Sequence, residues 1–234
     1  MASSRTKKTG EVKVARRGRP PLSATQKPKK IIILESALRE FSIHGYDGAK
    51  ISDIAKRAEV VTPAVHYHFK TKDELWKAAM SYSFDQLDAS NEISEDSALQ
   101  DLDEYSLFRV IVRRYIRFSI TRPEHARIVF LEGLRETDRS QWLLERFLEP
   151  LHLRHRKLFK TLRKKGVIKS YSELTFFSVM GGAVMALVGN LQMVGPLYGI
   201  DNVDDKILRK QEDAIIDILF NGFLRRDDEA SSRT

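Results

Sequence analysis

Two stretches of the chain hold side chains suited to binding nucleic acid. Residues 62–68 read TPAVHYH, which places a threonine, two histidines and a tyrosine within two helical turns. Such groups hydrogen-bond to base edges and to phosphate oxygens. Residues 17–20 read RGRP, and arginine side chains of this kind enter narrow A·T-rich minor grooves. The chemistry that both stretches indicate is recognition of double-stranded DNA.

The residues around the first stretch predict a short helix, a tight turn and a second helix. Ser52 is a suitable N-cap for the first helix, whose small apolar residues recur three and four positions apart. Thr62 and Pro63 mark the start of the second helix, because threonine caps free amides and proline is tolerated at the first helical position. Val65 and Phe69 are predicted to face inward, which leaves the polar side chains outside.

An upstream helix completes a three-helix unit, and a fourth helix follows it. Residues 29–44 carry an apolar stripe at helical spacing and stop at Gly45. Thr71 and Glu74 predict a capping box for the helix that follows. Lys72 lies in the first turn of that helix, where a cation opposes the helix dipole but is well placed for a phosphate.

The segment from Ile32 to Met80 resembles the N-terminal domain of the tetracycline-repressor (TetR) family of transcriptional regulators. Three positions depart from the family pattern: Glu59 replaces a glycine, Val61 a small polar residue, and His66 the first tyrosine of an L-Y-x-H-F pattern. The resemblance implies an all-α fold of about nine helices. In it, a three-helix DNA-binding domain is joined to a larger helical domain for ligand binding and dimerisation.

The resemblance also implies how the protein meets DNA. A homodimer sets two copies of the second helix into successive major grooves of a roughly palindromic operator. We expect contacts to base edges from Thr62, Ala64 and His66. We expect contacts to phosphates from Ser52, Tyr67, His68 and Lys72. For Tyr67 and His68, packing between helices is an open alternative.

The basic charge of the chain is concentrated at its start. The first thirty residues hold ten Lys or Arg and one acid, a net charge of +9, whereas the rest carries −1. Arg17, Gly18, Arg19 and Pro20 resemble the core of AT-hook peptides. The arm is predicted to be disordered when free. It either enters the minor groove through Arg17 and Arg19 or adds only non-specific affinity by releasing counterions.

Four segments are predicted in all. They are the basic arm (1–28), the helix-turn-helix domain (29–76), a C-terminal domain (77–226) and a disordered tail (227–234). Within the C-terminal domain, Ser170 and Glu173 predict a capping box for a helix that is apolar nearly all round. The resemblance implies that this helix and the last one pair with their twins in the dimer. Candidate dimer contacts are Met185, Gly189, Ile215 and Leu219.

A small-molecule effector is a further implication of the resemblance. Binding in the C-terminal domain would change the separation of the two DNA-reading domains. The aromatic and methionine side chains favour an apolar or aromatic effector, although such stripes are more often plain core. Candidate lining residues are Phe108, Tyr115, His125, Trp142, Phe147, Phe177 and Met180. Glu132 with Arg127, His125 and Tyr115 is a hypothetical polar cluster in this cavity; an ordinary ion pair is the alternative.

Catalytic and metal sites are not predicted. The sequence has no phosphate loop, dinucleotide fingerprint, nucleophile elbow or zinc-protease motif, so we expect neither a catalytic residue nor a cofactor. His152 and His155 lie three apart, but two ligands without a third do not predict a metal. Cysteine is absent and no apolar run approaches about twenty residues. We therefore expect no disulfide, no membrane partner and a cytoplasmic location.

These observations favour a ligand-responsive regulator that represses transcription and leaves its operator when an effector binds. Two alternatives stay open. An architectural protein would bind DNA weakly and non-specifically through its basic arm, without an inducer. An enzyme fused to a DNA-binding module would need a polar, convergent pocket.

Overall fold

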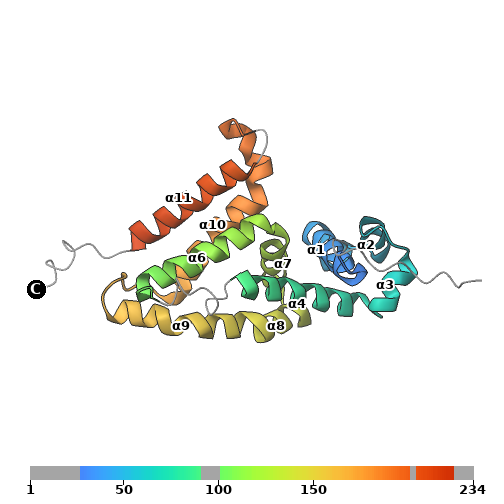
Figure 1. The fold of residues 1–234 in the computed structure, drawn as a ribbon, viewed down its shortest axis with the longest axis horizontal. Helices are drawn as coiled ribbons and strands as arrows, with labels where there is room; N and C mark the ends of the chain where they lie inside the picture. The colour runs from blue at the N-terminus through green and yellow to red at the C-terminus, as the bar shows by residue number, and fades with distance from the viewer. Residues whose placement is uncertain (1–26, 91–100, 201–203, 224–234) are drawn as a thin grey trace, which may run out of the picture.

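The computed structural model describes residues 27–90, 101–200 and 204–223, and its regular elements are all helices (Figure 1). The N-terminal part contains α1 (Lys29–Gly48), α2 (Ile51–Arg57), α3 (Thr62–His68) and α4 (Lys72–Ser90). The C-terminal part contains α6 (Glu104–Thr121), α7 (Pro123–Gly133), α8 (Asp138–Leu143), the π-helical turn η1 (Leu144–Leu148), α9 (Glu149–Lys164), α10 (Glu173–Val194), the 3₁₀ turn η2 (Gly195–Tyr198) and α11 (Asp205–Phe223). Because α8, η1 and α9 follow one another without a break, these residues form nine helices. The predicted all-α fold is confirmed.

Two of the predicted N-caps are wrong. The N-cap of α2 is Lys50, so Ser52 lies inside the first turn and caps nothing. The N-cap of α3 is Val61, and Thr62 is already helical, with no side-chain hydrogen bond to a free amide. Both helices therefore begin one or two residues earlier than the polar residues suggest, and only the predicted proline near the start of α3 is in place.

Other helix ends follow the predicted chemistry more closely. Thr71 Oγ1 accepts a hydrogen bond from the Glu74 amide at 3.0 Å, and the Glu74 carboxylate accepts one from the Lys70 amide at 3.0 Å. The carboxylate thus reaches one residue further back than a capping box requires. Gly45 has φ 67° and ψ 177°, which breaks the helical path of α1 at the predicted stop.

The cap of α10 differs from the prediction. Ser172 Oγ accepts from the Thr175 amide at 3.0 Å, whereas Ser170 makes no such bond and Glu173 is the first residue of the helix. The serine two residues later is the one that faces the free amides of the first turn. The predicted pairing of Ser170 with Glu173 is therefore wrong.

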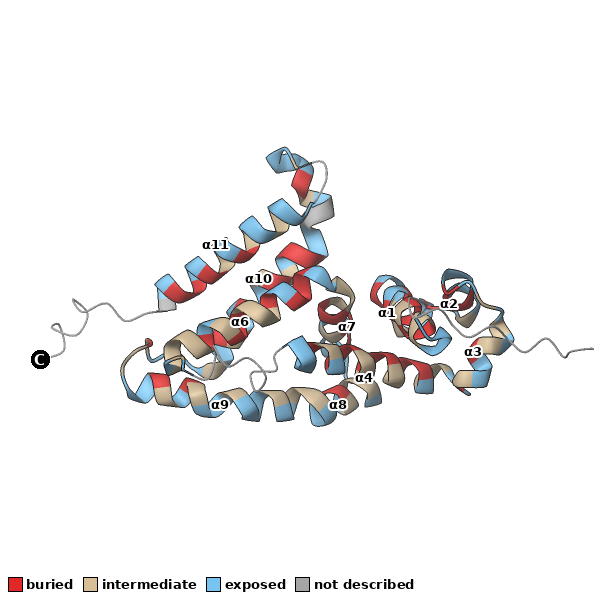
Figure 2. Ribbon diagram, viewed as in Figure 1, coloured by how far each residue is buried: buried red, intermediate tan, exposed pale blue. Residues whose placement is uncertain are grey.

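One hydrophobic core joins the two predicted domains. α4 runs through the predicted boundary at residue 76, and Trp76 itself is fully buried in this core. Phe41 from α1 belongs to the same cluster as Ile128 from α7 and Leu143 from α8. The buried faces of these helices meet at the centre of the molecule (Figure 2). The helix-turn-helix is thus packed against its neighbour rather than tethered to it.

A second core lies among α6, α9, α10 and α11. Its centre is aromatic, with Phe108 5.3 Å from Phe176 and 5.8 Å from Phe220, measured between ring centroids. α11 turns its buried side chains toward α6 and leaves its other face exposed (Figure 2). One face of this amphipathic helix is thus buried against α6.

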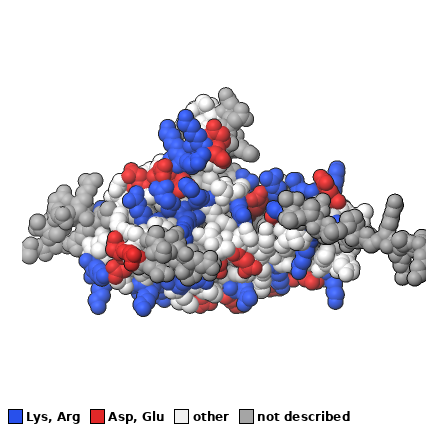
Figure 3. All heavy atoms as spheres, in the orientation of Figure 1, with Lys and Arg blue, Asp and Glu red and all other residues white. Residues whose placement is uncertain are grey.

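An ion-pair network holds α11 on α6. The Glu212 carboxylate, which is only 2 % exposed, lies 3.1 Å from Arg113 Nη1 and 2.9 Å from Arg117 Nε. Arg113 also pairs with Asp213 at 2.5 Å. Acidic and basic side chains adjoin over this region in the space-filling view (Figure 3). Two guanidinium groups compensate the burial of one carboxylate.

α10 corrects one expectation from the sequence. Its residues Glu173–Asn190 form an 18-residue window that is long and apolar enough to cross a membrane, by length and composition alone. The sequence predicts no apolar run of about twenty residues; the hydropathy of this window comes from its Leu, Phe, Val, Met and Ala residues, which polar residues and glycines interrupt. In the structure α10 packs against α6, α7 and α11.

Candidate DNA-binding interface and effector cavity

α3 lies at one end of the molecule, far from α9 and α11 (Figure 1). Val65 and Phe69 are 1 % and 3 % exposed, as predicted, and they fix the helix to α1, α2 and α4. Tyr67 is 86 % exposed. Two side chains thus anchor this helix of seven residues, which leaves Pro63, His66 and Tyr67 exposed.

The predicted DNA-reading residues share the outer side of α3. His66 and Tyr67 are exposed, and Thr62, Ala64 and His68 are half-buried. The Tyr67 ring makes an edge contact with the neighbouring His68 ring at 5.2 Å and does not pack between helices. His68 also contacts the Phe69 ring at 6.2 Å, so it retains a packing role.

Two further predicted contacts lie beside α3. Ser52 is exposed on α2. Lys72 Nζ donates to the Asp47 carbonyl oxygen at 3.2 Å and lies 4.8 Å from the centre of the Tyr46 ring. Burial lowers the pKa of Lys72 from its usual value. Its ammonium is thus held against the α1 kink, at the edge of the α3 surface. Arg17 and Arg19 lie outside the residues that the structure describes.

A buried ion pair positions α2. The Glu40 carboxylate is 5 % exposed and lies 2.7 Å from Arg57 Nε and 3.5 Å from His44 Nε2. Arg57 is the last residue of α2, whereas Glu40 belongs to α1. The pair therefore locks the first helix of the motif to the domain core. The sequence pattern did not single out these residues, since charged side chains seventeen positions apart give no local signal.

The turn between α2 and α3 contains a strained residue. Glu59 has φ 53°, the left-handed region, and among the described residues it is the only one other than glycine with positive φ. This is the position at which the family pattern has glycine. A side chain in this conformation costs on the order of 1–2 kcal/mol. The departure from the pattern therefore has a price in stability.

Replacing Glu59 with glycine should relieve this strain. We expect Glu59→Gly to raise the free energy of unfolding by about 0.5–1 kcal/mol, because the relief exceeds the extra entropy that glycine loses on folding. Glu59→Ala keeps the Cβ atom and should change nothing. Urea unfolding followed by circular dichroism measures both variants. Equal stabilisation by glycine and alanine would show that the Glu59 carboxylate, not its backbone, is the source of the effect.

A cavity of about 250 Å³ lies between α4, α6, α7, α9 and α10. Most of its wall is apolar, and its polar lining groups belong to a tyrosine and three histidines. The lining residues are Phe84, Phe108, Ile111, Val112, Tyr115, His125, Val129, Leu148, Leu151, His152, His155, Phe177, Met180 and Gly181. An apolar cavity with a few convergent polar groups is typical of a small-molecule site.

Five of the seven predicted lining residues reach this cavity; Trp142 and Phe147 do not. Trp142 packs on the Trp76 ring at 5.7 Å, in the core that joins the two parts of the chain. Phe147 stacks on Phe84 at 4.2 Å, behind the cavity wall. Their prediction as lining residues is wrong. Phe84, at the far end of α4 from α3, takes their place in the lining and was not predicted.

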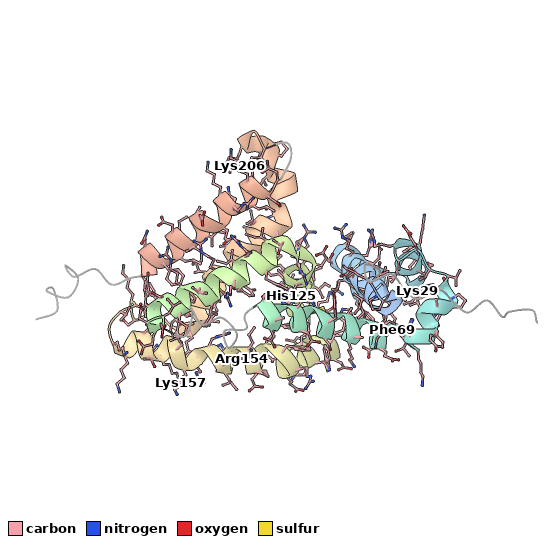
Figure 4. The ribbon with its side chains drawn as sticks, viewed as in Figure 1. Lys29, Phe69, His125, Arg154, Lys157 and Lys206 are labelled. Atoms are coloured by element: carbon pink, nitrogen blue, oxygen red, sulfur yellow. The ribbon has the colours of Figure 1, made fainter. Side chains whose placement is uncertain are left out.

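His125 is the most deeply buried polar group of the wall, between α7 and α4 (Figure 4). Its Nδ1 atom lies 2.9 Å from Ser83 Oγ on α4. Its ring meets the edges of Phe84 at 4.5 Å and Phe118 at 5.4 Å. Burial lowers the pKa of His125 to about 4, so the imidazole is neutral near pH 7.

The hypothetical polar cluster around Glu132 does not form. The Glu132 carboxylate accepts from Thr137 Oγ1 at 3.2 Å and pairs with Arg139 at 3.4 Å. Arg127 instead donates from Nε to the Val188 carbonyl oxygen at 2.9 Å. The ordinary ion pair, which was the alternative, is correct, although Glu132 is buried rather than at the surface.

The two histidines of α9 both line the cavity. His152 Nε2 lies 3.2 Å from the Glu173 carboxylate, which also pairs with Arg156. His155 is half-buried, and this burial is the main reason why its pKa lies below the usual value for histidine. Within residues 27–90, 101–200 and 204–223, no group of three or more His, Asp or Glu side chains is arranged to hold a metal ion.

The predicted dimer contacts divide into two groups. Leu219 is 8 % exposed and Ile215 packs beside it, so both belong to the second core of this chain. Met185 is half-buried and Gly189 is exposed on α10. Among the α11 side chains whose burial is described, the large apolar one that is exposed is Ile218, at 71 %. Leu174 on α10 is similarly exposed, at 77 %.

Part of the chain is similar to a known family of proteins. The model of the bacterial regulatory proteins of the tetR family matches residues 33–79, which cover α1 to α4. The biofilm operon icaADBC HTH-type negative transcriptional regulator IcaR of Staphylococcus aureus is 28% identical over 93 residues, or 38% of this chain and 50% of that protein. The chain thus spans about half the length of the curated relatives it matches.

Solved structures share the fold well beyond the DNA-binding part. The fatty acid degradation regulator FadR from Bacillus halodurans has a TM-score of 0.60 and 17% identity, over 86% of this chain and 100% of that one. A TetR family transcription regulator from Marinobacter aquaeolei VT8 has a TM-score of 0.59 and 19% identity, over 85% and 96%. The helix-turn-helix part of this chain, residues 33–79, is thus similar to the tetR family of bacterial regulatory proteins, and the described helices share their fold with solved regulators.

Proposed function

We propose that this protein is a homodimeric repressor that binds a DNA operator through α3 and leaves it when a small molecule occupies the cavity. The observation that carries the proposal is the course of α4. This helix begins at Lys72, directly after the α3 surface; its residue Phe84 lines the cavity, and Ser83 hydrogen-bonds to the lining residue His125. A ligand that displaces either residue moves the same rigid element that supports α3.

The DNA contacts are assigned from exposure and side-chain chemistry. His66, with Thr62 and Ala64, is proposed to face base edges, since these residues lie on the outer side of α3. Tyr67 and His68 are proposed to meet phosphates, together with Ser52 and Lys72 at the edges of the surface. From Ile31 to Met80 the chain has equal numbers of acidic and basic residues, so specific contacts must arise from hydrogen bonds more than from net charge.

Two variants of α3 test these roles. Tyr67→Ala should weaken binding about tenfold to an operator duplex and to a scrambled duplex alike, because a phosphate contact carries no sequence information. His66→Ala should weaken binding to the operator and leave the scrambled duplex unchanged. Fluorescence anisotropy with both duplexes measures the four affinities. Equal losses on both duplexes for both variants would refute the assignment of His66 to a base edge.

The basic arm is proposed to supply long-range attraction, with Arg17 and Arg19 in the minor groove. Removing residues 1–26 deletes seven Lys or Arg residues and one acid. We expect the slope of log affinity against log salt concentration to decrease in magnitude by about 2 or more, because binding then releases fewer counterions. An unchanged salt dependence would mean that the arm makes no phosphate contact. Loss of all binding would instead favour the architectural alternative, in which the arm alone binds DNA.

A further inference from the structure

The cavity has an unusual balance of polar groups. Its polar lining side chains are Tyr115, His125, His152 and His155, and none of its described lining residues is Lys, Arg, Asp or Glu. His152 already pairs with Glu173 at 3.2 Å. An anionic group of a ligand would therefore lose its hydration in this cavity. No side chain of the lining would supply an unpaired cation to compensate for that loss. Burial of an unpaired carboxylate is among the largest penalties that a binding site imposes.

His125 is the group best placed to orient a ligand. Its Nδ1 atom is engaged by Ser83, which leaves Nε2 as the ring nitrogen open to a hydrogen bond from a ligand. The ring is 3 % exposed and is held on two sides by Phe84 and Phe118. A ring nitrogen that no protein group engages can donate a hydrogen bond to a polar group of a ligand, or accept one from it, according to the tautomer of the ring. The neutral state of the ring agrees with an uncharged partner.

The volume limits the size of the ligand. An apolar cavity of roughly 150 Å³ holds a benzene molecule, so the present space of about 250 Å³ holds about ten heavy atoms. Aromatic side chains such as Phe108 and Phe177 line it, and Met180 adds an adaptable thioether. Flat aromatic compounds fit such a wall well, since ring contacts add to the burial of apolar area.

We propose that the cavity binds an uncharged aromatic molecule of about ten heavy atoms that carries one hydrogen-bonding group, and that this group pairs with His125 Nε2. The inference rests on the proposed effector site and narrows its ligand class from apolar to uncharged with a single polar end. Ser83 on α4 is hydrogen-bonded to the other nitrogen of the same ring. A ligand bound to His125 is therefore connected through this ring to the helix that supports α3.

A matched set of three compounds tests the class. 4-Ethylbenzamide, 4-ethylbenzoate and 1-ethyl-4-isopropylbenzene have the same number of heavy atoms and differ in charge and polarity. Calorimetric titration of the full chain at neutral pH, without DNA, should show that the benzamide binds at least about 100-fold more tightly than the benzoate. Benzoate affinity within threefold of the benzamide, or saturable binding of neither, would overturn the proposal.

Two substitutions of His125 separate the ligand contact from a structural role. The side-chain amide of asparagine can replace Nδ1 and keep Ser83, whereas that of glutamine reaches the position of Nε2. We expect His125→Asn to weaken benzamide binding about tenfold and His125→Gln to weaken it little, with the hydrocarbon unaffected by either. If His125→Asn lowers the affinity for all three compounds equally, the His125 ring contributes only to the shape of the cavity and makes no hydrogen bond to the ligand.

The test also distinguishes the ligand class from the proposed function. Binding of the benzamide to the free protein measures the cavity alone. Release of an operator duplex by the benzamide, followed by fluorescence anisotropy, measures the regulation. If the compound binds with the expected selectivity and the duplex stays bound, the ligand class stands and the coupling through α4 fails. If the selectivity is absent, the ligand class fails whatever the duplex does.

Discussion

Trp76→Ala is expected to lower the free energy of unfolding by about 3–5 kcal/mol, the loss typical of truncating a fully buried tryptophan. Trp76 is fully buried, and its ring meets Tyr46 of α1 at 6.4 Å and Trp142 of α8 at 5.7 Å. The substitution therefore opens a cavity in the core that the helix-turn-helix shares with the C-terminal helices. Because both parts lose packing, one cooperative transition should shift as a whole.

Urea unfolding followed by circular dichroism measures this loss. Tyr67→Ala is the control, since an exposed ring on α3 should change stability by less than about 0.5 kcal/mol. Trp76→Phe keeps most of the ring volume and should lose less than alanine; it remains measurable if the alanine variant fails to fold. A second, separate transition in either variant would contradict the shared core, because it would mean that the two parts unfold independently.

Ile218→Arg is expected to convert the proposed dimer to monomers and to lower operator affinity by at least about 100-fold. Ile218 is 71 % exposed on the outer face of α11, next to a helix that exposes Leu174 to a similar degree. A buried arginine without a partner disrupts an apolar contact between two copies. A monomer has a single α3. It therefore lacks the increase in effective concentration that a dimer has at the second half-site once the first is bound.

Light scattering after size exclusion gives the mass, and fluorescence anisotropy gives the affinity. Leu153→Arg is the matched control, because Leu153 is 54 % exposed on α9, on the other side of the second core from α11. It should remain dimeric and bind DNA as the parent does. A dimeric Ile218→Arg protein would show that the contact between copies lies elsewhere on the surface.

The sequence was most informative where periodicity and burial coincide. Val65 and Phe69 were predicted to anchor α3 because they lie one turn apart, and both are buried. The helix caps were predicted less well. Ser52 and Thr62 are suitable N-cap residues, yet their helices begin at or before them, because the residues just upstream already form the start of the first turn. Propensity identifies a helix start only to within a residue or two.

The cavity lining depended on information that the sequence does not contain. Phe147 lies inside η1, whose π-helical turn inserts extra backbone and rotates the residues that follow away from the regular helical phase. Trp142 is on a correctly predicted inner face, but periodicity does not say which neighbour that face meets. Phe84 reached the lining because α4 is long enough to pass from the DNA-binding part to the cavity.

Glu59 is a case in which the sequence and the structure explain each other. The family resemblance marks the position as one for glycine, and the backbone at Glu59 has the left-handed φ of 53° that favours glycine. The resemblance alone gives no reason for the glycine. The positive φ gives that reason, and it predicts a backbone strain at Glu59 that can be measured.

The central claim is that α3 reads a specific operator in a dimer, and selection from a random duplex library tests it most directly. The full chain is expected to enrich an inverted repeat whose half-site centres lie about one helical turn, or a multiple of it, apart. The enriched duplex should bind at least about 1,000-fold more tightly than a scrambled one at physiological salt. No enriched sequence, with equal affinity for all duplexes, would contradict the account and favour a non-specific DNA-binding protein.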